Sequence, residues 1–241
     1  MPSVSNRIVW ITGAGSGIGH ALAVEYANRA FTTILSGRNE APLKRLRKAI
    51  NDNGGNAHCF VCDVRNVESV NTVARKIIGS IGIPDILVNN AGITVFKEFI
   101  ETSVEEFDDI ISTNLRGSFL TTKAVLPSMM KRKNGIVLNI VSFAAKTTYT
   151  ASSAYAASKS GLAAMMDGLR AEVRSHGIKI VNVFPGAVLT PIWSSKVRTK
   201  YGDTMLTTED AAKMICSVSC QPQSLMVEEL VIRPQTGDIN A

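Results

Sequence analysis

The chain has 241 residues, of which 45% are hydrophobic and 19% are charged. This composition is that of a folded globular protein and is too apolar for a disordered chain. The net charge of +6 would suit an anionic partner only if the basic residues clustered, and they do not cluster strongly, so nucleic acid is a weak hypothesis.

Short, apolar, β-branched runs alternate with longer helical patterns along the chain. The predicted strands are residues 8–11, 33–36, 57–61, 86–88, 136–140, 179–184 and 229–232. The predicted helices lie between them, at residues 18–30, 41–53, 67–78, 104–130, 153–176 and 208–217. Nearly continuous apolar strands are typical of a sheet covered on both faces by helices. The alternation predicts one α/β domain over residues 1–241 with an open, mostly parallel, doubly wound sheet, on which ligands bind beyond the carboxyl ends of the strands.

The four cysteines raise the question of a metal site, because Cys59 and Cys62 have C-x2-C spacing and Cys216 and Cys220 form a looser pair. Cys59 and Cys62 lie in a strand-like run whose side chains alternate between faces, and no histidine follows at ligand spacing. We therefore predict buried thiols and no metal. Few, irregularly spaced cysteines and the lack of an N-terminal apolar segment predict a cytoplasmic protein, and no segment approaches the roughly 18 apolar residues of a membrane span.

The first predicted strand runs into Thr12-Gly-Ala-Gly-Ser-Gly-Ile-Gly19, and a helix follows. A glycine-rich turn of this kind lets the backbone approach a diphosphate, while the helix N-terminus supplies N–H groups and a favourable dipole. The spacing is G-x-x-x-G-x-G, formed by Gly13, Gly17 and Gly19. Taken alone the motif is weak, since glycines also make tight turns.

Charged residues after the second and third strands bear on the choice of cofactor. Arg38 follows the second strand, and no acidic residue occurs before Glu40. An arginine here would pair with a 2′-phosphate, whereas an acid would accept from a free ribose hydroxyl. We therefore predict NADP(H) in preference to NAD(H), unless Arg38 merely begins a solvated helix. Asp63 is placed to accept from the adenine amino group, to cap the next helix, or both.

Tyr155 and Lys159 stand four residues apart on one face of a predicted helix. A nearby cation would lower the pKa of the phenol and make it a usable acid and base. Ser142 ends the fifth strand, where its hydroxyl could bind a substrate carbonyl or simply cap the strand. Asn114 interrupts the long predicted helix, where it could hold a water, bind a backbone carbonyl or be exposed.

The order and spacing of these motifs resemble the short-chain dehydrogenase/reductase family over essentially the whole chain. The matching residues are Thr12-Gly13-x3-Gly17-x-Gly19, Asp63, Asn89-Asn90-Ala91-Gly92, Asn114, Ser142, Tyr155-x3-Lys159 and Pro185-Gly186. The resemblance implies a seven-stranded Rossmann sheet, frequently in a tetramer, and a catalytic tetrad of Asn114, Ser142, Tyr155 and Lys159. It also implies that Asn90 supports the cofactor ribose and that Pro185 to Thr190 line the nicotinamide. The expected cofactor-binding residues are Gly13, Ser16, Gly17, Ile18, Gly19, Arg38, Asp63, Val64, Asn90, Ala91, Gly92, Tyr155, Lys159, Pro185, Gly186, Val188 and Thr190.

These motifs predict an NADP(H)-dependent oxidoreductase that interconverts a carbonyl and a secondary alcohol. Tyr155 is expected to transfer the proton and Ser142 to hold the substrate oxygen. Lys159 is expected to lower the pKa of Tyr155 and, by the resemblance, to bind the nicotinamide ribose. Asn114 is expected to hold the water through which the proton is replaced.

The substrate is far less constrained by the sequence. Residues 190–207 are expected to form a short lid, and Phe96, Phe143, Tyr149 and Trp193 to supply apolar walls. Basic residues of the lid could meet an acidic carrier of a 3-oxoacyl thioester, or form a solvated loop. The alternatives are a broad carbonyl reductase, an NAD(H)-dependent dehydrogenase of a sugar, polyol or steroid, and an NADP-binding regulator without turnover. The expected partners are a small molecule and other copies of the chain, as a tetramer or dimer, with no nucleic acid and no membrane.

Overall fold

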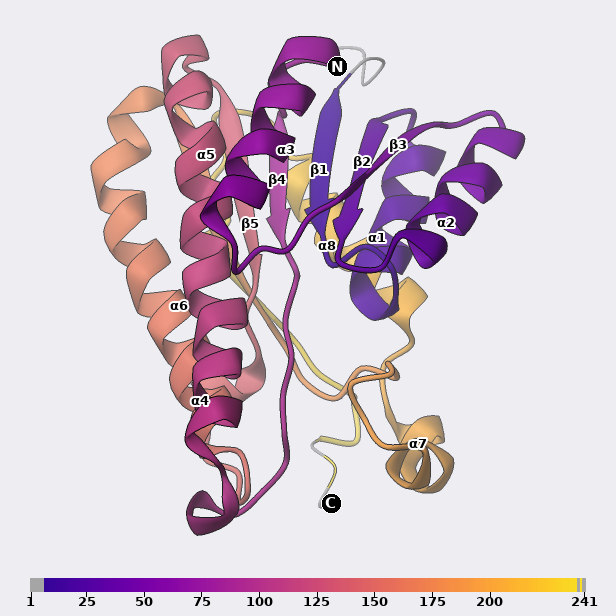
Figure 1. The fold of residues 1–241 in the computed structure, drawn as a ribbon, viewed down its shortest axis with the longest axis vertical. Helices are drawn as coiled ribbons and strands as arrows, with labels where there is room; N and C mark the ends of the chain where they lie inside the picture. The colour runs from indigo at the N-terminus through magenta and orange to yellow at the C-terminus, as the bar shows by residue number, and fades with distance from the viewer. Residues whose placement is uncertain (1–6, 238, 240–241) are drawn as a thin grey trace.

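Seven parallel strands form one sheet in the computed structural model, which describes residues 7–237 and 239 (Figure 1). The strand order is β3-β2-β1-β4-β5-β6-β7. The strands are β1 (Ile8–Thr12), β2 (Thr32–Gly37), β3 (Asn56–Val61), β4 (Ile86–Asn89), β5 (Gly135–Ile140), β6 (Ile178–Pro185) and β7 (Glu229–Ile232). The order reverses between β1 and β4, which leaves a crevice beyond the carboxyl ends of these strands. The predicted doubly wound Rossmann-like α/β fold is confirmed.

Helices cover both faces of the sheet. They are α1 (Gly17–Asn28), α2 (Glu40–Asp52), α3 (Val67–Ser80), α4 (Val104–Ile111), α5 (Gly117–Arg132), α6 (Ser153–Val173), α7 (Ser195–Tyr201) and α8 (Thr208–Ser219). Figure 1 shows α7 and the loops that follow β4 and β6 beyond the carboxyl ends of the strands.

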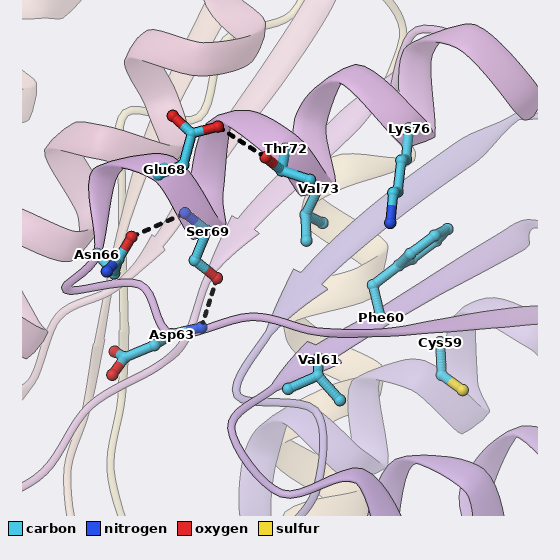
Figure 2. Close-up of a pocket in the computed structure, with 10 residues that line it drawn as sticks. All are labelled: Cys59, Phe60, Val61, Asp63, Asn66, Glu68, Ser69, Thr72, Val73 and Lys76. Carbon is cyan, nitrogen blue, oxygen red and sulfur yellow. Dashed lines mark hydrogen bonds between the residues drawn. The ribbon is translucent and has the colours of Figure 1, made fainter.

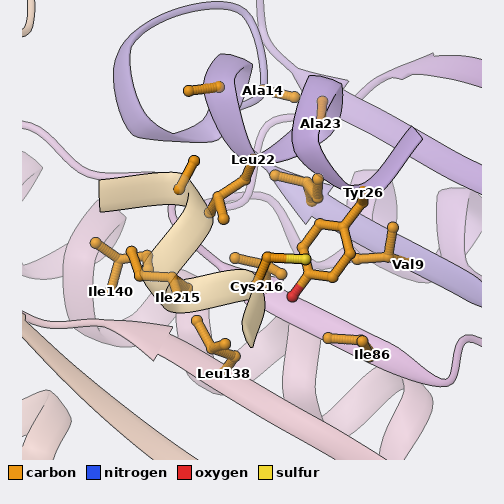
Figure 3. Close-up of a cluster of buried hydrophobic side chains, with 14 of the residues drawn as sticks. Val9, Ala14, Leu22, Ala23, Tyr26, Ile86, Leu138, Ile140, Ile215 and Cys216 are labelled. Carbon is orange, nitrogen blue, oxygen red and sulfur yellow. The ribbon is translucent and has the colours of Figure 1, made fainter. Parts of the chain in front are cut away.

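Strands β1 to β6 contribute alternate side chains to two separate cores. Val9 of β1 packs with α1, α2 and α8, where Tyr26 and Cys216 meet (Figure 3). Trp10 faces α3, α5 and α6, is fully buried, and donates a hydrogen bond from Nε1 to Ser36 Oγ at 2.8 Å. Burial on both faces explains why the strands read as nearly continuous apolar runs.

Three buried asparagines cross the middle of the sheet at one level. Asn89 of β4, Asn139 of β5 and Asn182 of β6 are register partners in turn. Asn89 Nδ2 donates to Asn139 Oδ1 at 2.9 Å, and Asn139 Nδ2 donates to Asn182 Oδ1 at 3.1 Å. At the two ends of this asparagine row, Asn89 bonds Thr121 and Thr122 of α5, and Asn182 bonds Asp167 of α6. The row fixes the relative register of the strands whose ends form the crevice.

Two elements differ from the sequence prediction. The helix expected over residues 104–130 is divided into α4 and α5 by a π turn over Ser112–Arg116. Helix α7 lies inside the segment expected to be a lid, and Ser194 caps it by accepting a hydrogen bond from Val197 N. Its alternating basic residues lack an apolar helical stripe, so periodicity could not reveal it.

Among the residues that the structure describes, the cysteines form no metal-binding group. Cys62 and Cys216 are buried, while Cys59 and Cys220 are only partly covered. Residues 7–237 and 239 contain no group of three or more histidine, cysteine or acidic residues that could hold a metal ion. Over the same residues, every helix is too short or too polar to cross a membrane.

Candidate active site

A cavity of about 840 Å³ lies at the carboxyl ends of the strands. It is bordered by the glycine turn after β1, the loops after β2 to β6, and the start of α6. Of the residues predicted from the sequence to form the site, all line this cavity except Gly19 and Asn114. Those two lie directly behind its wall, as described below.

The glycine turn after β1 brings backbone close to the cavity, because glycines occupy its tightest positions. Gly13 has a φ of +66°, and a Cβ there would lie 2.9 Å from Ala91 Cα. A Cβ on Gly19 would lie 2.4 Å from Asn90 Nδ2, so Gly19 is required for packing beneath the turn. The turn leads into the N-terminus of α1, whose N-cap Ser16 makes no side-chain capping bond. Such a cradle fits the diphosphate of a dinucleotide.

Thr12 and Asn90 tie the glycine turn to the loop after β4. Thr12 Oγ1 accepts hydrogen bonds from the backbone N–H groups of Asn90 and Ala91, at 3.0 and 3.1 Å. Asn90 Nδ2 donates to the carbonyl oxygens of Thr12 and Gly13, at 2.9 and 3.1 Å. Asn90 therefore supports the turn itself, a role that the sequence alone did not reveal.

Arg38 and Asp63 lie at one end of the cavity. Asp63 is held by Arg65, whose Nε and Nη2 donate to its two carboxylate oxygens at 3.1 and 2.9 Å. These hydrogen bonds, together with the charge of Arg38, hold the pKa of Asp63 below its ordinary value. The N-cap of α3 is Asn66, so the suggestion that Asp63 caps this helix is wrong. Arg65 is not predictable as a site residue, because nothing in its sequence position shows that its side chain turns back to Asp63.

The other end of the cavity holds Ser142, Tyr155 and Lys159. The Ser142 side chain lies close enough to the Tyr155 phenol to lower its pKa. Lys159 is 4% exposed, and its Nζ donates to the carbonyl of Ile140 at 2.6 Å. Burial without a carboxylate partner lowers the pKa of Lys159 to about 8.

Tyr155 departs from one sequence-based expectation. Burial raises the pKa of its phenol above the ordinary value, and the Ser142 side chain opposes that rise only in part. Lys159 was expected to lower this pKa, but its Nζ lies 5.7 Å from the centre of the Tyr155 ring and points at Ile140. In this geometry the loss of solvation of the phenolate sets the direction of the pKa shift.

Asn114 lies in the π turn and is fully buried. Its Oδ1 accepts from Ile93 N, and its Nδ2 donates to Ile93 O and to Ser158 Oγ, each at 2.9 Å. Of the sequence-based alternatives, binding to a backbone carbonyl is confirmed and exposure is wrong. A Cβ on Gly92 would lie 3.4 Å from Asn114 Oδ1 and 3.5 Å from Lys159 Nζ, so these two polar groups flank Gly92 closely.

Aromatic side chains form the outer wall of the cavity. The rings of Phe96 and Trp193 are stacked, with centroids 5.0 Å apart and planes 7° apart. Trp193 Nε1 donates to Val188 O at 3.1 Å, while Phe143 and Tyr149 line the cavity nearby. The stack joins the loop after β4 to the segment after β6. Among the lining residues that the structure describes, the charged ones are Arg38, Asp63 and Lys159.

A second, shallower hollow lies between β3 and α3 (Figure 2). Asp63 borders it through its backbone, whose N–H donates to Ser69 Oγ at 3.1 Å. Of the two cysteines with C-x2-C spacing, Cys59 lines this hollow and Cys62 does not. This hollow contains none of the other predicted site residues.

A family model for short chain dehydrogenases matches residues 7–201. The chain belongs to this family. A sepiapterin reductase of Chlorobaculum tepidum is 34% identical to it over 97% of the chain and 98% of that protein. The short-chain dehydrogenase matches also include solved structures. A serine dehydrogenase complexed with NADP+ has a TM-score of 0.90 at 28% identity, covering 97% of each chain. A variant actinorhodin polyketide ketoreductase with NADPH has a TM-score of 0.89 at 27% identity, covering 99% of this chain and all of that one.

Membership of the short-chain dehydrogenase family, with relatives matched along nearly their full length, makes the chain an NAD(P)-dependent oxidoreductase. Its substrate and its choice between the two dinucleotides are separate questions, which depend on the side chains around the cavity.

Proposed function

We propose that this short-chain dehydrogenase reduces an uncharged carbonyl compound with NADPH, and oxidises the corresponding secondary alcohol in reverse. One observation carries the proposal. The hydroxyls of Ser142 and Tyr155 line the same cavity as buried Lys159, and the glycine turn borders that cavity too. A proton donor and a dinucleotide cradle thus border the same space.

The dinucleotide, when bound, supplies hydride to the carbonyl carbon. Ser142 donates a hydrogen bond to the carbonyl oxygen, which becomes more negative as hydride arrives. Tyr155 gives its phenolic proton to this oxygen and becomes a phenolate. Its raised pKa keeps the phenol protonated before the reaction, and the Lys159 ammonium stabilises the phenolate afterwards. Asn114 is bonded to Ile93 and Ser158 and holds the inner wall of the cavity. The proton that Tyr155 gives up is replaced through water at this wall.

The proposed preference for NADP(H) rests on the charges at the adenosine end. Arg38 lines the cavity there and can pair with a 2′-phosphate. The one acid among the described lining residues, Asp63, already accepts hydrogen bonds from Arg65, which makes it a poor acceptor for a ribose hydroxyl. The complexes of two similar proteins with NADP+ and NADPH support the same choice.

The proposed substrate class follows from the aromatic half of the cavity. This half is bordered by four aromatic residues, Phe96, Phe143, Tyr149 and Trp193. The charged residue that the structure describes in this half is Lys159, whereas Arg38 and Asp63 lie at the other end. Burying an unpaired substrate carboxylate or phosphate against these rings would be unfavourable. The segment over residues 190–207 acts as the lid in this proposal.

A carrier-linked acyl thioester is the second candidate substrate. Lys196, Arg198 and Lys200 of α7 are exposed to solvent rather than lining the cavity. In that position they could contact an acidic carrier outside the cavity while its uncharged acyl group enters. A substrate panel that includes carrier-linked and free carbonyl compounds distinguishes the two candidates.

The replacement Tyr155→Phe tests the proposed chemistry. It removes the proton donor and keeps the ring, so turnover in an NADPH-oxidation assay should fall about 10²- to 10⁴-fold while NADPH affinity is unchanged. Tyr26→Phe is the matched control, because the Tyr26 hydroxyl is buried away from the cavity and bonds Ser219 between α1 and α8. It should lower stability and leave turnover intact. A Tyr155→Phe enzyme with wild-type turnover would refute the mechanism, and a wild-type protein that binds NADPH but reduces no carbonyl would favour a regulator.

A further inference from the structure

Two cysteines lie one helical turn apart at the end of α8. Cys216 is fully buried in the core that α8 shares with α1 (Figure 3). Cys220 ends the helix as its C-cap residue and is only partly covered. Both are free thiols, and the proposed carbonyl reduction uses neither of them. The pair therefore combines a partly exposed cysteine with one that is kept from solvent.

The spacing of Cys216 and Cys220 suits a disulfide bond after a small movement. In an α-helix, Cα atoms four residues apart are separated by about 6.2 Å, and disulfides span roughly 4.4 to 6.8 Å between Cα atoms. The two Cβ atoms, about 5 to 6 Å apart on a helix, must approach to about 4 Å. Cys220 has left the helical conformation, with a φ of −95° and a ψ of 4°, so it can move while the helix stays intact.

The surroundings of Cys220 favour its thiolate, which is the reactive form of a cysteine. The neighbouring Cys216 thiol lowers the pKa of Cys220 to about 6, and the charges of Arg29 and Arg7 act in the same direction against burial. Arg29 also pairs with Glu25 at 2.7 Å, so its charge is shared. The Cys220 sulfur and burial raise the pKa of Cys216, so the proton stays on the buried sulfur.

We propose that Cys216 and Cys220 form a reversible oxidation site whose oxidant is a hydroperoxide. The Cys220 thiolate attacks one peroxide oxygen, the O–O bond breaks, and the departing oxygen takes a proton from water. Cys220 is then a sulfenic acid. The Cys216 sulfur attacks the Cys220 sulfur, an S–S bond replaces the S–O bond, and the hydroxyl leaves with the Cys216 proton as water. The two thiols lose two electrons, and the hydroperoxide gains them.

The other two cysteines of the chain provide a contrast. Cys59 is partly covered, as Cys220 is, and packs against the core on the α1 side of the sheet. Cys62 lies in the core on the opposite face of the sheet. A disulfide between these two would have to cross the sheet layer, although their C-x2-C spacing is the shorter one. Only the pair in α8 should therefore form a disulfide.

The test exposes the full chain to hydrogen peroxide, blocks the remaining thiols with iodoacetamide and digests the protein with trypsin. Cys216 and Cys220 fall on one peptide, residues 214–241, and Cys59 and Cys62 on another, residues 49–65. We expect the first peptide to lose its free thiols at least about tenfold faster than the second. Its mass should fall by two hydrogen atoms, and dithiothreitol should restore both thiols. Equal rates for the two peptides, or no disulfide in residues 214–241, would overturn the proposal.

Single replacements separate the two roles. In Cys216→Ser the sulfenic acid of Cys220 should persist and react with dimedone, whereas in Cys220→Ser the buried Cys216 should stay reduced. Cys59→Ser is the matched control, because it removes a partly covered cysteine from the other pair and should leave oxidation of residues 214–241 unchanged. Oxidation of Cys216 at the wild-type rate in Cys220→Ser would contradict the assignment of Cys220 as the attacking thiol. All of these readouts are independent of carbonyl reduction, so their failure would leave the proposed function intact.

Discussion

Arg38 and Asp63 carry the two opposite charges at the adenosine end of the cavity, and their surroundings differ. Asp63 is paired with Arg65, which in turn contacts Asp109 of α4 at 2.9 Å. Arg38 precedes α2 and lowers the pKa of Asp63 only through its charge, as a minor contributor. A dianionic 2′-phosphate would therefore meet Arg38 as its main positive partner at this end.

Arg38→Asp should reverse the cofactor preference, because the new carboxylate repels a 2′-phosphate and accepts from a ribose hydroxyl. We expect the ratio of kcat/KM for NADPH to that for NADH to fall by about 10²-fold or more, since charge-assisted hydrogen bonds contribute about 1.5 to 3 kcal/mol each. Arg45→Asp makes the same charge change on the exposed face of α2 and should leave the ratio unaltered. An unchanged ratio in Arg38→Asp would show that Arg38 does not select the cofactor.

Individual site residues were predictable from the sequence where a short motif fixes them, as for Gly13, Tyr155 and Lys159. Their partners were not. Ser158 and Ile93 bond Asn114 across large separations in the chain, and Asn114 itself lies in a π turn that no propensity predicts. The raised pKa of Tyr155 likewise depends on how completely the surrounding segments bury it.

The asparagine row acts at the level of elements, because it links α5, β4, β5, β6 and α6 through buried amides. Every member both donates and accepts, so removing the central one leaves a buried donor on one side and a buried acceptor on the other. Beyond their ends, β4 and β5 lead into Asn90 and Ser142, which both line the cavity. Strand register and site geometry are therefore maintained by the same hydrogen bonds.

Asn139→Leu should be strongly destabilising although leucine has a similar volume. Asn89 Nδ2 keeps Thr122 as a partner, but Asn182 Oδ1 loses its donor, so we expect a loss of about 2 to 4 kcal/mol in the free energy of unfolding. Urea unfolding, with the slope m checked for constancy, measures this. Asn71→Leu on the exposed face of α3 should change stability by no more than about 0.5 kcal/mol. Equal effects of the two replacements would contradict the role of the row.

Element positions were largely predictable, because buried parallel strands and amphipathic helices leave local patterns. All seven strands lie within a residue or two of the predicted ranges. The division of residues 104–130 and the presence of α7 were missed for a common reason. Both are set by contacts with other segments. Asn114 bonds Ile93 in the loop after β4. At the base of the lid segment, Leu189 N donates a hydrogen bond to Leu206 O at 2.9 Å.

The stability of the whole molecule should depend on pH through Lys159. Its pKa falls from near 10.5 to about 8 on folding, so the unfolded chain binds more protons than the folded one between these values. Stability contributed by this group therefore increases as pH rises from about 8 toward 10.5. Below pH 8, burying the ammonium costs free energy in full.

Lys159→Met should remove this dependence. In the absence of dinucleotide, we expect the variant to exceed the wild type in unfolding free energy near pH 7. This difference should shrink by an amount on the order of 3 kcal/mol as pH rises toward 10.5. Urea unfolding at a series of pH values measures it, and the subtraction cancels other titrating groups common to both proteins. A difference that stays constant between pH 7 and pH 10 would show that Lys159 titrates normally in the folded state.

The chain has two tryptophans, and the structure gives them separate optical roles. Trp10 is sealed inside the sheet, so its emission should shift to the red only when the strands separate. Trp193 lies against Phe96 at the outer wall of the cavity, so its emission should respond when the segment after β6 moves or a ligand enters. The wild-type protein thus carries a built-in pair of fluorophores, and replacing one indole at a time separates a binding signal from an unfolding signal without any attached dye.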